Sequence, residues 1–418
     1  MRTAAGGGDE HAPVVLAEGG ASTVDGTPSW HHRSVPEPMS VAALFAGIGG
    51  IELGLEGAGF HTEYLCEWWE PARCVLRRRF PDARLVGDVE EIVALPPVTV
   101  VTAGFPCTDL SQAGRTAGIE GRHSGLVRKA LALVADHDAS WLLLENVRNM
   151  LPLHGGRAMA AITEELDRMG FRWAYRLVDS RFTGVPQRRQ RVILLASRTE
   201  DPRAVLFGDD AGERDEALFA DDAYGFFWTE GLRGLGWCRD GVPTLKGGST
   251  IGIPSPPGVW LPGNESGKRF VTPGISTGER LQGFRKGWTA PAAAHRRGIG
   301  ARWKLVGNAV TVGVSAWVGR RLAEPGHWDR TLSTALPSGT AWPMAAWGER
   351  NKAWRVDVSM WPELHPYEHL VELMGDDYTP LSHRGASGFL DRLERGTLRV
   401  PEQFRLDLKE HIEVTREP

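Results

Sequence analysis

Cys107 has the setting that best suits covalent chemistry. It stands in Gly104-Phe-Pro-Cys107-Thr-Asp-Leu-Ser111-Gln112-Ala-Gly114, directly after the apolar residues 98–103. A cysteine on a polar loop at the carboxyl end of a buried strand can act as a nucleophile, whereas most free cysteines pack as small apolar residues. The residues that follow are locally basic: Arg115, Arg122, His123 and Arg128 stand against Glu120. We therefore expect a reactive thiolate at Cys107.

An acid and two arginines could handle protons and hold a base. Glu145 ends the apolar run Leu142-Leu-Leu-Glu145. An acid at the tip of a buried strand loses solvent, which raises its pKa and lets it donate a proton near neutral pH; a helix-capping carboxylate fits this position equally well. In Gln187-Arg-Arg189-Gln-Arg191, alternation puts Arg189 and Arg191 on one side of an extended chain. There they could bind a phosphate or a base carbonyl, or form a solvated basic edge.

A glycine-rich turn points to a nucleoside cofactor. Phe45-Ala-Gly47-Ile-Gly49-Gly follows a predicted strand, and glycines there let the backbone approach a ligand closely. Glu67 lies twenty residues beyond Gly47, where its carboxylate could accept hydrogen bonds from two ribose hydroxyls. Trp68 offers a flat face for adenine, and Asp88 could take the adenine amino group. The spacing to Glu67 favours a cofactor over a tight turn without a ligand.

These residues need strands that end at a common edge. Apolar runs predict strands at residues 40–45, 61–67, 98–103, 141–145 and 191–196. Helical periodicity predicts helices at residues 51–58, 70–80, 125–137 and 157–169. Strands that alternate with helices of this length predict an α/β fold with a mostly parallel sheet covered on both faces.

The pattern changes outside that region. Residues 1–38 have the composition of a disordered arm. Residues 200–222 hold nine acidic residues against two arginines, and residues 223–276 are rich in Gly, Pro and Trp. That stretch predicts a separate small domain of short strands and loops. Helical signal returns at residues 278–284 and 310–322, and residues from 325 onward predict loops followed by helices at 363–374, 382–395 and 401–413.

The composition excludes several classes of protein. Of 418 residues, 42% are hydrophobic and 24% are charged, which excludes a wholly disordered or fibrous chain. No run approaches the ~20 apolar residues of a membrane span, so we expect no membrane partner. Four cysteines without a Cys-x-x-Cys pair argue against disulfides and a metal site and favour the cytoplasm. The net charge of −4 still allows a local basic face.

The order of the motifs resembles that of the cytosine-5 DNA methyltransferase family, in the form found in bacterial modification enzymes. Six elements occur in the family's order over residues 40–322: Phe-x-Gly-x-Gly-Gly from Phe45, Pro106-Cys107, Glu145-Asn-Val, Gln187-Arg-Arg-x-Arg, Glu279-Arg-Leu-Gln-Gly-Phe and Gly307-Asn308. The resemblance implies a Rossmann-like methyltransferase fold. It places the catalytic domain at residues 39–198 and 277–324 and a target-recognition domain at 199–276. Residues 325–418 receive no assignment from the resemblance, and their pattern predicts a C-terminal extension of loops and then helices.

The resemblance also implies a reaction and a role for each residue. C5 of cytosine is a poor nucleophile toward a methyl sulfonium, and addition of the Cys107 thiolate at C6 would turn the ring into an enamine. Glu145 would protonate or hydrogen-bond N3, while Arg191, and less directly Arg189, would hold O2 and the surrounding loop. The methyl group would come from S-adenosyl-L-methionine. The cofactor-binding positions would be Phe45, Gly47, Gly49, Glu67, Trp68, Asp88, Val89, Pro106, Asn308 and Ala309.

Double-stranded DNA is the expected partner. Gln112 would fill the space left by a flipped base, and Thr244-Leu245 resembles the Thr-Leu element of the family's recognition domains. Residues 223–276 carry five basic against three acidic side chains, so we expect this part to face phosphates. The candidate DNA-binding residues are Ser111, Gln112, Arg122, Arg233, Thr244 and Lys246.

Two departures and two alternatives remain. Thr311 stands where many members have proline, and Gln190 where glutamate is common; neither is a proposed catalytic group, so we expect activity. The alternatives are the tRNA-methylating branch of the family and a catalytically silent DNA-binding regulator. The recognition segment of 78 residues favours duplex DNA, and the intact Cys107 and Glu145 argue against the regulator. We expect a monomeric enzyme that acts beside a restriction or antiviral defence system.

Overall fold

The computed structural model describes residues 39–105, 124–227, 236–247, 256–295 and 298–416. The arm expected at residues 1–38 and the segment that carries Cys107 lie outside these ranges. No helix within them is long and apolar enough to cross a membrane.

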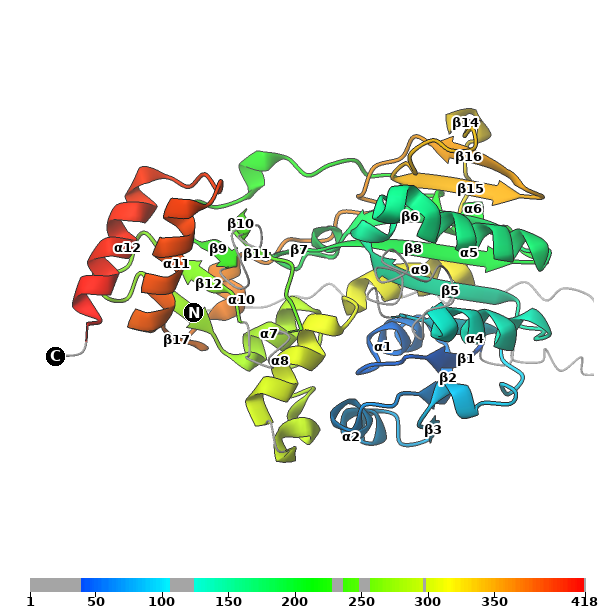
Figure 1. The fold of residues 1–418 in the computed structure, drawn as a ribbon, viewed down its shortest axis with the longest axis horizontal. Coiled ribbons are helices and arrows are strands. Elements are labelled where there is room, and N and C mark those ends of the chain that lie inside the picture. The colour runs from blue at the N-terminus through cyan, green and yellow to red at the C-terminus, as the bar shows by residue number, and fades with distance from the viewer. Residues whose placement is uncertain (1–38, 106–123, 228–235, 248–255, 296–297, 417–418) are drawn as a thin grey trace, which may run out of the picture. The chain divides into compact units, whose positions relative to one another are not determined.

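A ten-stranded sheet carries the predicted strands, and one half of it is parallel (Figure 1). The parallel half has the order β5-β4-β1-β2-β3. Its strands are β1 (Ser40–Leu44), β2 (His61–Cys66), β3 (Arg84–Val86), β4 (Val100–Ala103) and β5 (Trp141–Val147). The helices of this part of the chain are α1 (Gly50–Glu56), α2 (Glu70–Arg79), α4 (Ser124–Ala135) and α5 (Arg157–Arg168). Because these strands are parallel, the segments that follow β1, β2, β4 and β5 start at one edge.

The other half of the sheet is antiparallel and draws on the C-terminal region. β8 lies between β5 and β6 and is antiparallel to both, and β15, β16 and β14 extend the sheet beyond β6. These strands are β6 (Arg172–Asp179), β8 (Gln190–Ser197), β14 (Ser333–Ala335), β15 (Ala345–Glu349) and β16 (Lys352–Val356). Residues 325–418 therefore supply strands to the main sheet, where the sequence predicted loops and then helices. The predicted α/β architecture is confirmed.

Helices cover both faces of the main sheet. On one face, Val101 and Leu144 belong to a buried cluster that includes Leu131 of α4 and Ile162 of α5. On the other face, Val100, Leu143 and Leu195 pack with Leu55 of α1 and Trp317 of α9 (Val312–Ala323). Strands buried on both sides read as continuous apolar runs, which is why the sequence located them.

A second sheet has the order β10-β9-β12-β13-β17 and is antiparallel. Its strands are β9 (Tyr224–Phe227), β10 (Gly236–Arg239), β12 (Gly258–Trp260), β13 (Phe270–Pro273) and β17 (Tyr378–Pro380). Figure 1 shows the C-terminal helices α11 (His383–Arg395) and α12 (Glu402–Val414) beside it. Phe389 of α11 stacks on Phe226 with ring centroids 4.7 Å apart, and the Trp260 indole N–H donates to Asp407 at 2.9 Å. The C-terminal region thus completes this sheet as well.

Short elements connect the two sheets. β7 (Gln187–Arg188) pairs in parallel with β11 (Val242–Pro243). The remaining helices are α6 (Pro202–Leu206), α7 (Ile275–Leu281), α8 (Gly298–Asn308) and α10 (Leu370–Met374). The segment that joins β7 to β8 carries Arg189, so the arginine motif lies between the two sheets.

Candidate active site

Glu145 and Arg191 form a buried ion pair where β5 meets β8. In the antiparallel register Val147 faces Arg191 and Glu145 faces Ile193, so both side chains project from the same face. Arg191 Nε lies 2.8 Å from Glu145 Oε1, and the two residues are only 7% and 9% exposed. Burial raises the pKa of Glu145, although the charges of Arg191 and Arg189 oppose that shift. The raised pKa predicted from the sequence is confirmed.

The chain that leads to Cys107 is fixed beside this pair. Gly104 follows β4, and a Cβ at this glycine would lie 3.6 Å from Glu145 Oε2. The Asn146 side-chain amide donates to the Phe105 carbonyl at 3.2 Å. Asn146 therefore holds the backbone two residues before Cys107. Of the predicted residues on that segment, Pro106, Cys107, Ser111, Gln112 and Arg122 lie outside the described residues.

Arg189 joins two distant segments through their backbones. Its guanidinium donates to the carbonyls of Leu245 at 3.1 Å, Gly307 at 3.2 Å and Ala309 at 2.6 Å, and the residue is 1% exposed. The sequence placed Arg189 and Arg191 side by side toward a base, whereas the structure places only Arg191 against Glu145. Arg189 instead ties the predicted Thr-Leu element to the segment around Asn308.

Gln187 shares this positioning role, which the sequence analysis did not find. Its side-chain oxygen accepts from the Leu245 amide at 2.9 Å, and its amide nitrogen donates to the Leu281 carbonyl at 2.8 Å. The residue is fully buried. A buried amide must satisfy both of its ends, so Gln187 fixes Leu245 relative to α7. The sequence signal that could have indicated this role is the position of Gln187, two residues before Arg189 in the same motif.

The predicted cofactor residues meet at the carboxyl ends of β1 and β2. Glu67 accepts from the Gly47 amide at 2.9 Å through one oxygen and from the Trp69 amide at 2.8 Å through the other. Burial raises the pKa of Glu67, which is 8% exposed. A Cβ on Gly47 would meet nothing within 4 Å, so open space lies beside the turn. Trp68 next to Glu67 is 76% exposed and presents its ring to that surface.

The turn before α1 depends on left-handed backbone. Phe45 has a φ of 57°, an unusual value for a side-chain-bearing residue, and Gly47 and Gly49 have φ of 58° and 79°. A Cβ on Gly49 would lie 2.2 Å from the Phe80 ring. Packing and backbone conformation thus both require glycine at position 49. The left-handed conformation of Phe45 is strained for a residue with a side chain, and such strain concentrates at functional sites.

The other predicted residues are more dispersed. Asp88 is exposed and caps a short turn by accepting from the Glu90 amide, while Val89 is buried. Asn308 is exposed at the end of α8, and a Cβ on Gly247 would lie 2.2 Å from its side-chain oxygen. Ala309 is buried beside it.

Two predicted DNA-binding residues fall within the described ranges. The Thr244 hydroxyl donates to the Arg188 carbonyl at 2.8 Å, and Lys246 is exposed with its ammonium 4.3 Å from the Phe227 ring centroid. They lie on the segment that Arg189 and Gln187 hold through Leu245. Arg233 lies outside the described residues.

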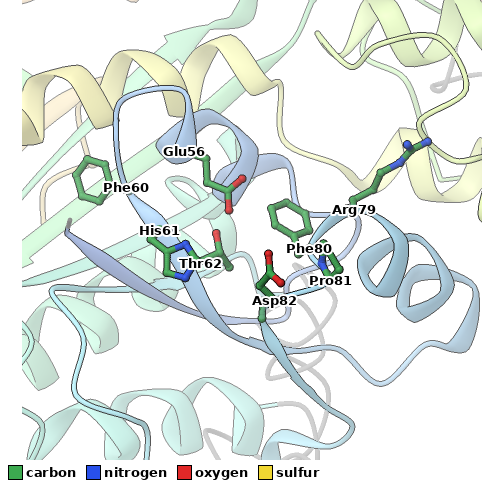
Figure 2. Close-up of a pocket in the computed structure, with 9 residues that line it drawn as sticks. Glu56, Phe60, His61, Thr62, Arg79, Phe80, Pro81 and Asp82 are labelled. Atoms are coloured by element: carbon green, nitrogen blue, oxygen red, sulfur yellow. The ribbon is translucent and has the colours of Figure 1, made fainter. Parts of the chain in front are cut away.

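The cavity in Figure 2 lies at the amino-terminal end of β2, opposite the end that carries Glu67. It has a volume of about 320 Å³. Figure 2 shows the Glu56 and Asp82 carboxylates and the Thr62 hydroxyl directed toward the same space. None of the described residues predicted for catalysis or cofactor binding lines it. We therefore do not assign this cavity to the candidate active site.

Glu52 is a buried acid that the sequence analysis missed. It is 1% exposed on α1, and one of its oxygens accepts from the Thr102 hydroxyl at 2.8 Å. Among the described residues its second oxygen has no hydrogen-bond partner. Burial raises the pKa of Glu52 to about 7. The ionised form of Glu52 is thus disfavoured beside Thr102, which lies two residues before Gly104, the glycine that borders Glu145.

Ionisation of Glu52 should destabilise the fold as the pH rises. Its pKa is about 4.5 when unfolded and about 7 when folded, so its stabilising contribution is complete below pH ~4.5 and is lost as the pH rises through ~7. Across that interval wild type should lose about 3 kcal/mol of unfolding free energy relative to Glu52→Gln. Urea unfolding from pH 5 to 8.5 measures this. Glu63→Gln, on an exposed β2 residue, controls for the loss of one carboxylate; parallel profiles of wild type and Glu52→Gln would refute the prediction.

The comparisons with known proteins agree with one family. The sequence profile of the C-5 cytosine-specific DNA methylases matches residues 39–214. The Type II methyltransferase M2.BsuMI of Bacillus subtilis (strain 168) is 45% identical over 370 residues, which cover 86% of this chain and 94% of that protein. The Type II methyltransferase M.Bsp6I of Bacillus sp. (strain RFL6) is 32% identical over 165 residues, 38% of this chain and 52% of that protein.

A solved structure is similar in fold. The crystal structure of S. pombe Dnmt2 methyltransferase matches with a TM-score of 0.50 and 15% identity, over 68% of this chain and 98% of that one. At this identity the match concerns the fold alone. The family assignment rests on the 45% identity to M2.BsuMI over most of both chains, together with the profile match. This chain belongs to the family of cytosine-5 DNA methyltransferases and is an enzyme of the Type II, restriction–modification kind.

Proposed function

We propose that this enzyme transfers a methyl group from S-adenosyl-L-methionine to C5 of cytosine at one short sequence in double-stranded DNA, through a covalent bond between Cys107 and C6. The observation that carries the proposal is the Glu145–Arg191 pair at 2.8 Å, beside the strand end that leads to Cys107. A buried acid with a raised pKa can serve N3 of a cytosine ring, and a buried cation beside it can serve O2.

Each side chain has a defined task in this mechanism. The Cys107 sulfur adds to C6, and Glu145 protonates or hydrogen-bonds N3 so that the electron pair displaced from the C5–C6 bond makes C5 nucleophilic. Arg191 donates to O2 and keeps Glu145 in place. After C5 is methylated, a base removes the C5 proton and the electron pair of that bond expels the Cys107 thiolate. A stacked cytosine cannot reach a buried carboxyl, so the base must flip out of the duplex.

The residues at the ends of β1 and β2 fit the cofactor. S-adenosyl-L-methionine supplies the methyl group as an electrophilic sulfonium. Each Glu67 oxygen accepts one backbone hydrogen bond and retains a lone pair for a ribose hydroxyl. The exposed Trp68 ring offers a stacking face, and the open space at Gly47 leaves room for the ligand. Phe45, Gly49, Asp88, Val89, Pro106, Asn308 and Ala309 complete the proposed cofactor-binding set.

We place DNA reading on residues 199–276. Thr244 and Lys246 lie on the segment that Arg189 and Gln187 anchor to the chain near Asn308, so the recognition element and the catalytic part are rigidly joined. Ser111, Gln112, Arg122 and Arg233 are the other proposed DNA contacts. The catalytic domain spans residues 39–198 and 277–324, and the proposed biological role is protection of host DNA within a restriction or antiviral defence system.

A cytosine-methylation map of DNA from an expressing host tests the proposal. The chain is expressed in a bacterium without its own cytosine-5 methylation, beside an empty vector, and bisulfite conversion is read at single-base resolution. We expect near-complete methylation of one short motif in the expressing strain only. An unmethylated genome would contradict the proposal, and methylation of tRNA by the purified enzyme would then support the tRNA-methylating alternative.

A further inference from the structure

Arg148 and Gln190 form a pair next to the proposed catalytic residues. Arg148 is the first residue after β5, at the start of the 3-10 turn Arg148–Met150, and Gln190 is the first residue of β8. Because Val147 is in register with Arg191, Arg148 and Gln190 stand one step further along the same strand pair. The Arg148 guanidinium donates to the Gln190 side-chain oxygen at 2.7 Å. This pair therefore lies at the sheet edge that carries Glu145, and alternation along β8 directs the Gln190 side chain to the face opposite that of Arg191.

Gln190 orients the Arg148 guanidinium without neutralising its charge. A glutamate at position 190 would form an ion pair with the guanidinium through its carboxylate. The Gln190 amide oxygen accepts the same hydrogen bond but carries no charge. In the part of the chain that the structure describes, no ion pair to Arg148 is found. A full positive charge thus stays at an exposed position.

The neighbouring arginines of the motif are already engaged. Arg191 pairs with Glu145, and Arg189 is buried against three backbone carbonyls. Arg148 is exposed. Under the proposed function, the strand that delivers a cytosine to Glu145 must pass the carboxyl end of β5, and Arg148 follows that end directly. Guanidinium groups bind phosphate oxygens through two parallel hydrogen bonds.

We propose that Arg148, oriented by Gln190, binds a DNA backbone phosphate beside the target cytosine, and that the neutral Gln190 keeps this cation available. The proposal rests on the proposed DNA substrate. It makes Arg148 a DNA-binding residue and Gln190 a positioning residue for DNA affinity, and it gives neither a part in the chemical step.

The salt dependence of DNA binding tests the proposal. The probe is a duplex that carries the mapped methylation motif, with S-adenosylhomocysteine present. Loss of one phosphate contact should reduce the slope of log K against log salt by about 0.9, so we expect that change for Arg148→Gln and for Gln190→Glu. Arg148→Lys should keep the slope. The KM for DNA should rise in the first two variants, while kcat at saturating DNA and affinity for the cofactor stay within twofold of wild type.

Arg168→Gln is the matched control. Arg168 is exposed at the end of α5, just before β6, and β6 begins opposite the end of β8. Arg168 therefore lies at the amino-terminal edge of β5 and β6. Its substitution removes the same formal charge, in this case from an arginine that is paired with Glu165. We expect its slope and KM to equal those of wild type.

Three results overturn the proposal. They are a wild-type slope in Arg148→Gln, a fall in kcat without a change in KM, and an equal change of slope in Arg168→Gln. Failure of the proposed function would look different, because wild type itself would then not methylate DNA.

Discussion

A Cys107→Ser variant is expected to lose at least about a thousandfold in methyl-transfer rate while it still binds the cofactor. A serine hydroxyl is almost fully protonated at neutral pH and adds poorly to C6, so C5 is not activated. Two contacts fix the chain before this residue: the Asn146 side chain donates to the Phe105 carbonyl, and Gly104 borders Glu145. The measurement is methyl transfer from labelled S-adenosyl-L-methionine to a duplex that carries the mapped motif.

A duplex with 5-fluorocytosine at the target position makes the covalent bond visible. Fluorine at C5 cannot leave as a proton, so the adduct cannot release the thiolate. Wild type should give a complex that survives denaturation, and Cys107→Ser should give none. Cys74→Ser is the matched control, because Cys74 lies on α2 with its thiol near Glu70, and this variant should behave as wild type. Residual methylation by Cys107→Ser near the wild-type rate would refute the covalent mechanism.

Much of the parallel half of the fold was predictable because β1, β4 and β5 are buried on both faces and read as apolar runs. β6 was not predicted, since Arg176 interrupts its pattern. Arg176 is fully buried, and it is tolerated because it donates to the carbonyls of Leu206 at 2.9 Å and Ser359 at 2.8 Å and pairs with Asp210. Those partners lie 30 residues or more away, so no local pattern could indicate them.

The β15–β16 hairpin was missed for a different reason. Its turn residues Arg350 and Asn351 have φ of 52° and 59°, the left-handed conformation of a tight hairpin, which Asn-Gly or Asp-Gly usually signals. The sequence analysis did not predict this turn because its first position holds arginine rather than asparagine or aspartate. Cross-strand stacking of Trp347 on Trp354, with centroids 4.1 Å apart, stabilises the hairpin.

The sequence indicates candidate site residues at the ends of strands, but it does not indicate how their side chains pair. Spacing placed Glu67 and Glu145 at strand ends, which local sequence determines. The Glu145–Arg191 contact depends on β8 entering antiparallel beside β5, a topological choice that periodicity does not show. Glu52 resembles an ordinary surface residue of an amphipathic helix, and only the packing of α1 over β4 reveals its burial.

Replacing Glu145 with glutamine is expected to lower kcat by about 10²- to 10⁴-fold, the range for loss of a general acid. Glutamine keeps the shape and one hydrogen bond but cannot give a proton to N3. The substitution also leaves Arg191 buried without its counter-charge, which costs about 3–5 kcal/mol of folding free energy. Single-turnover methyl transfer and urea unfolding should therefore be measured on the same preparations.

The double variant Glu145→Gln/Arg191→Met separates these two effects. It removes both charges, so no guanidinium that has lost the Glu145 carboxylate remains at a position that is only 7% exposed, and we expect it to recover most of the lost stability. Its rate should stay as low as that of Glu145→Gln or fall further, since Arg191 also holds O2. A recovery of rate together with stability would mean that Glu145 serves the fold alone. Recovered stability with a persistent loss of rate would instead show that the Glu145–Arg191 pair serves the chemical step, because folding could no longer account for the loss.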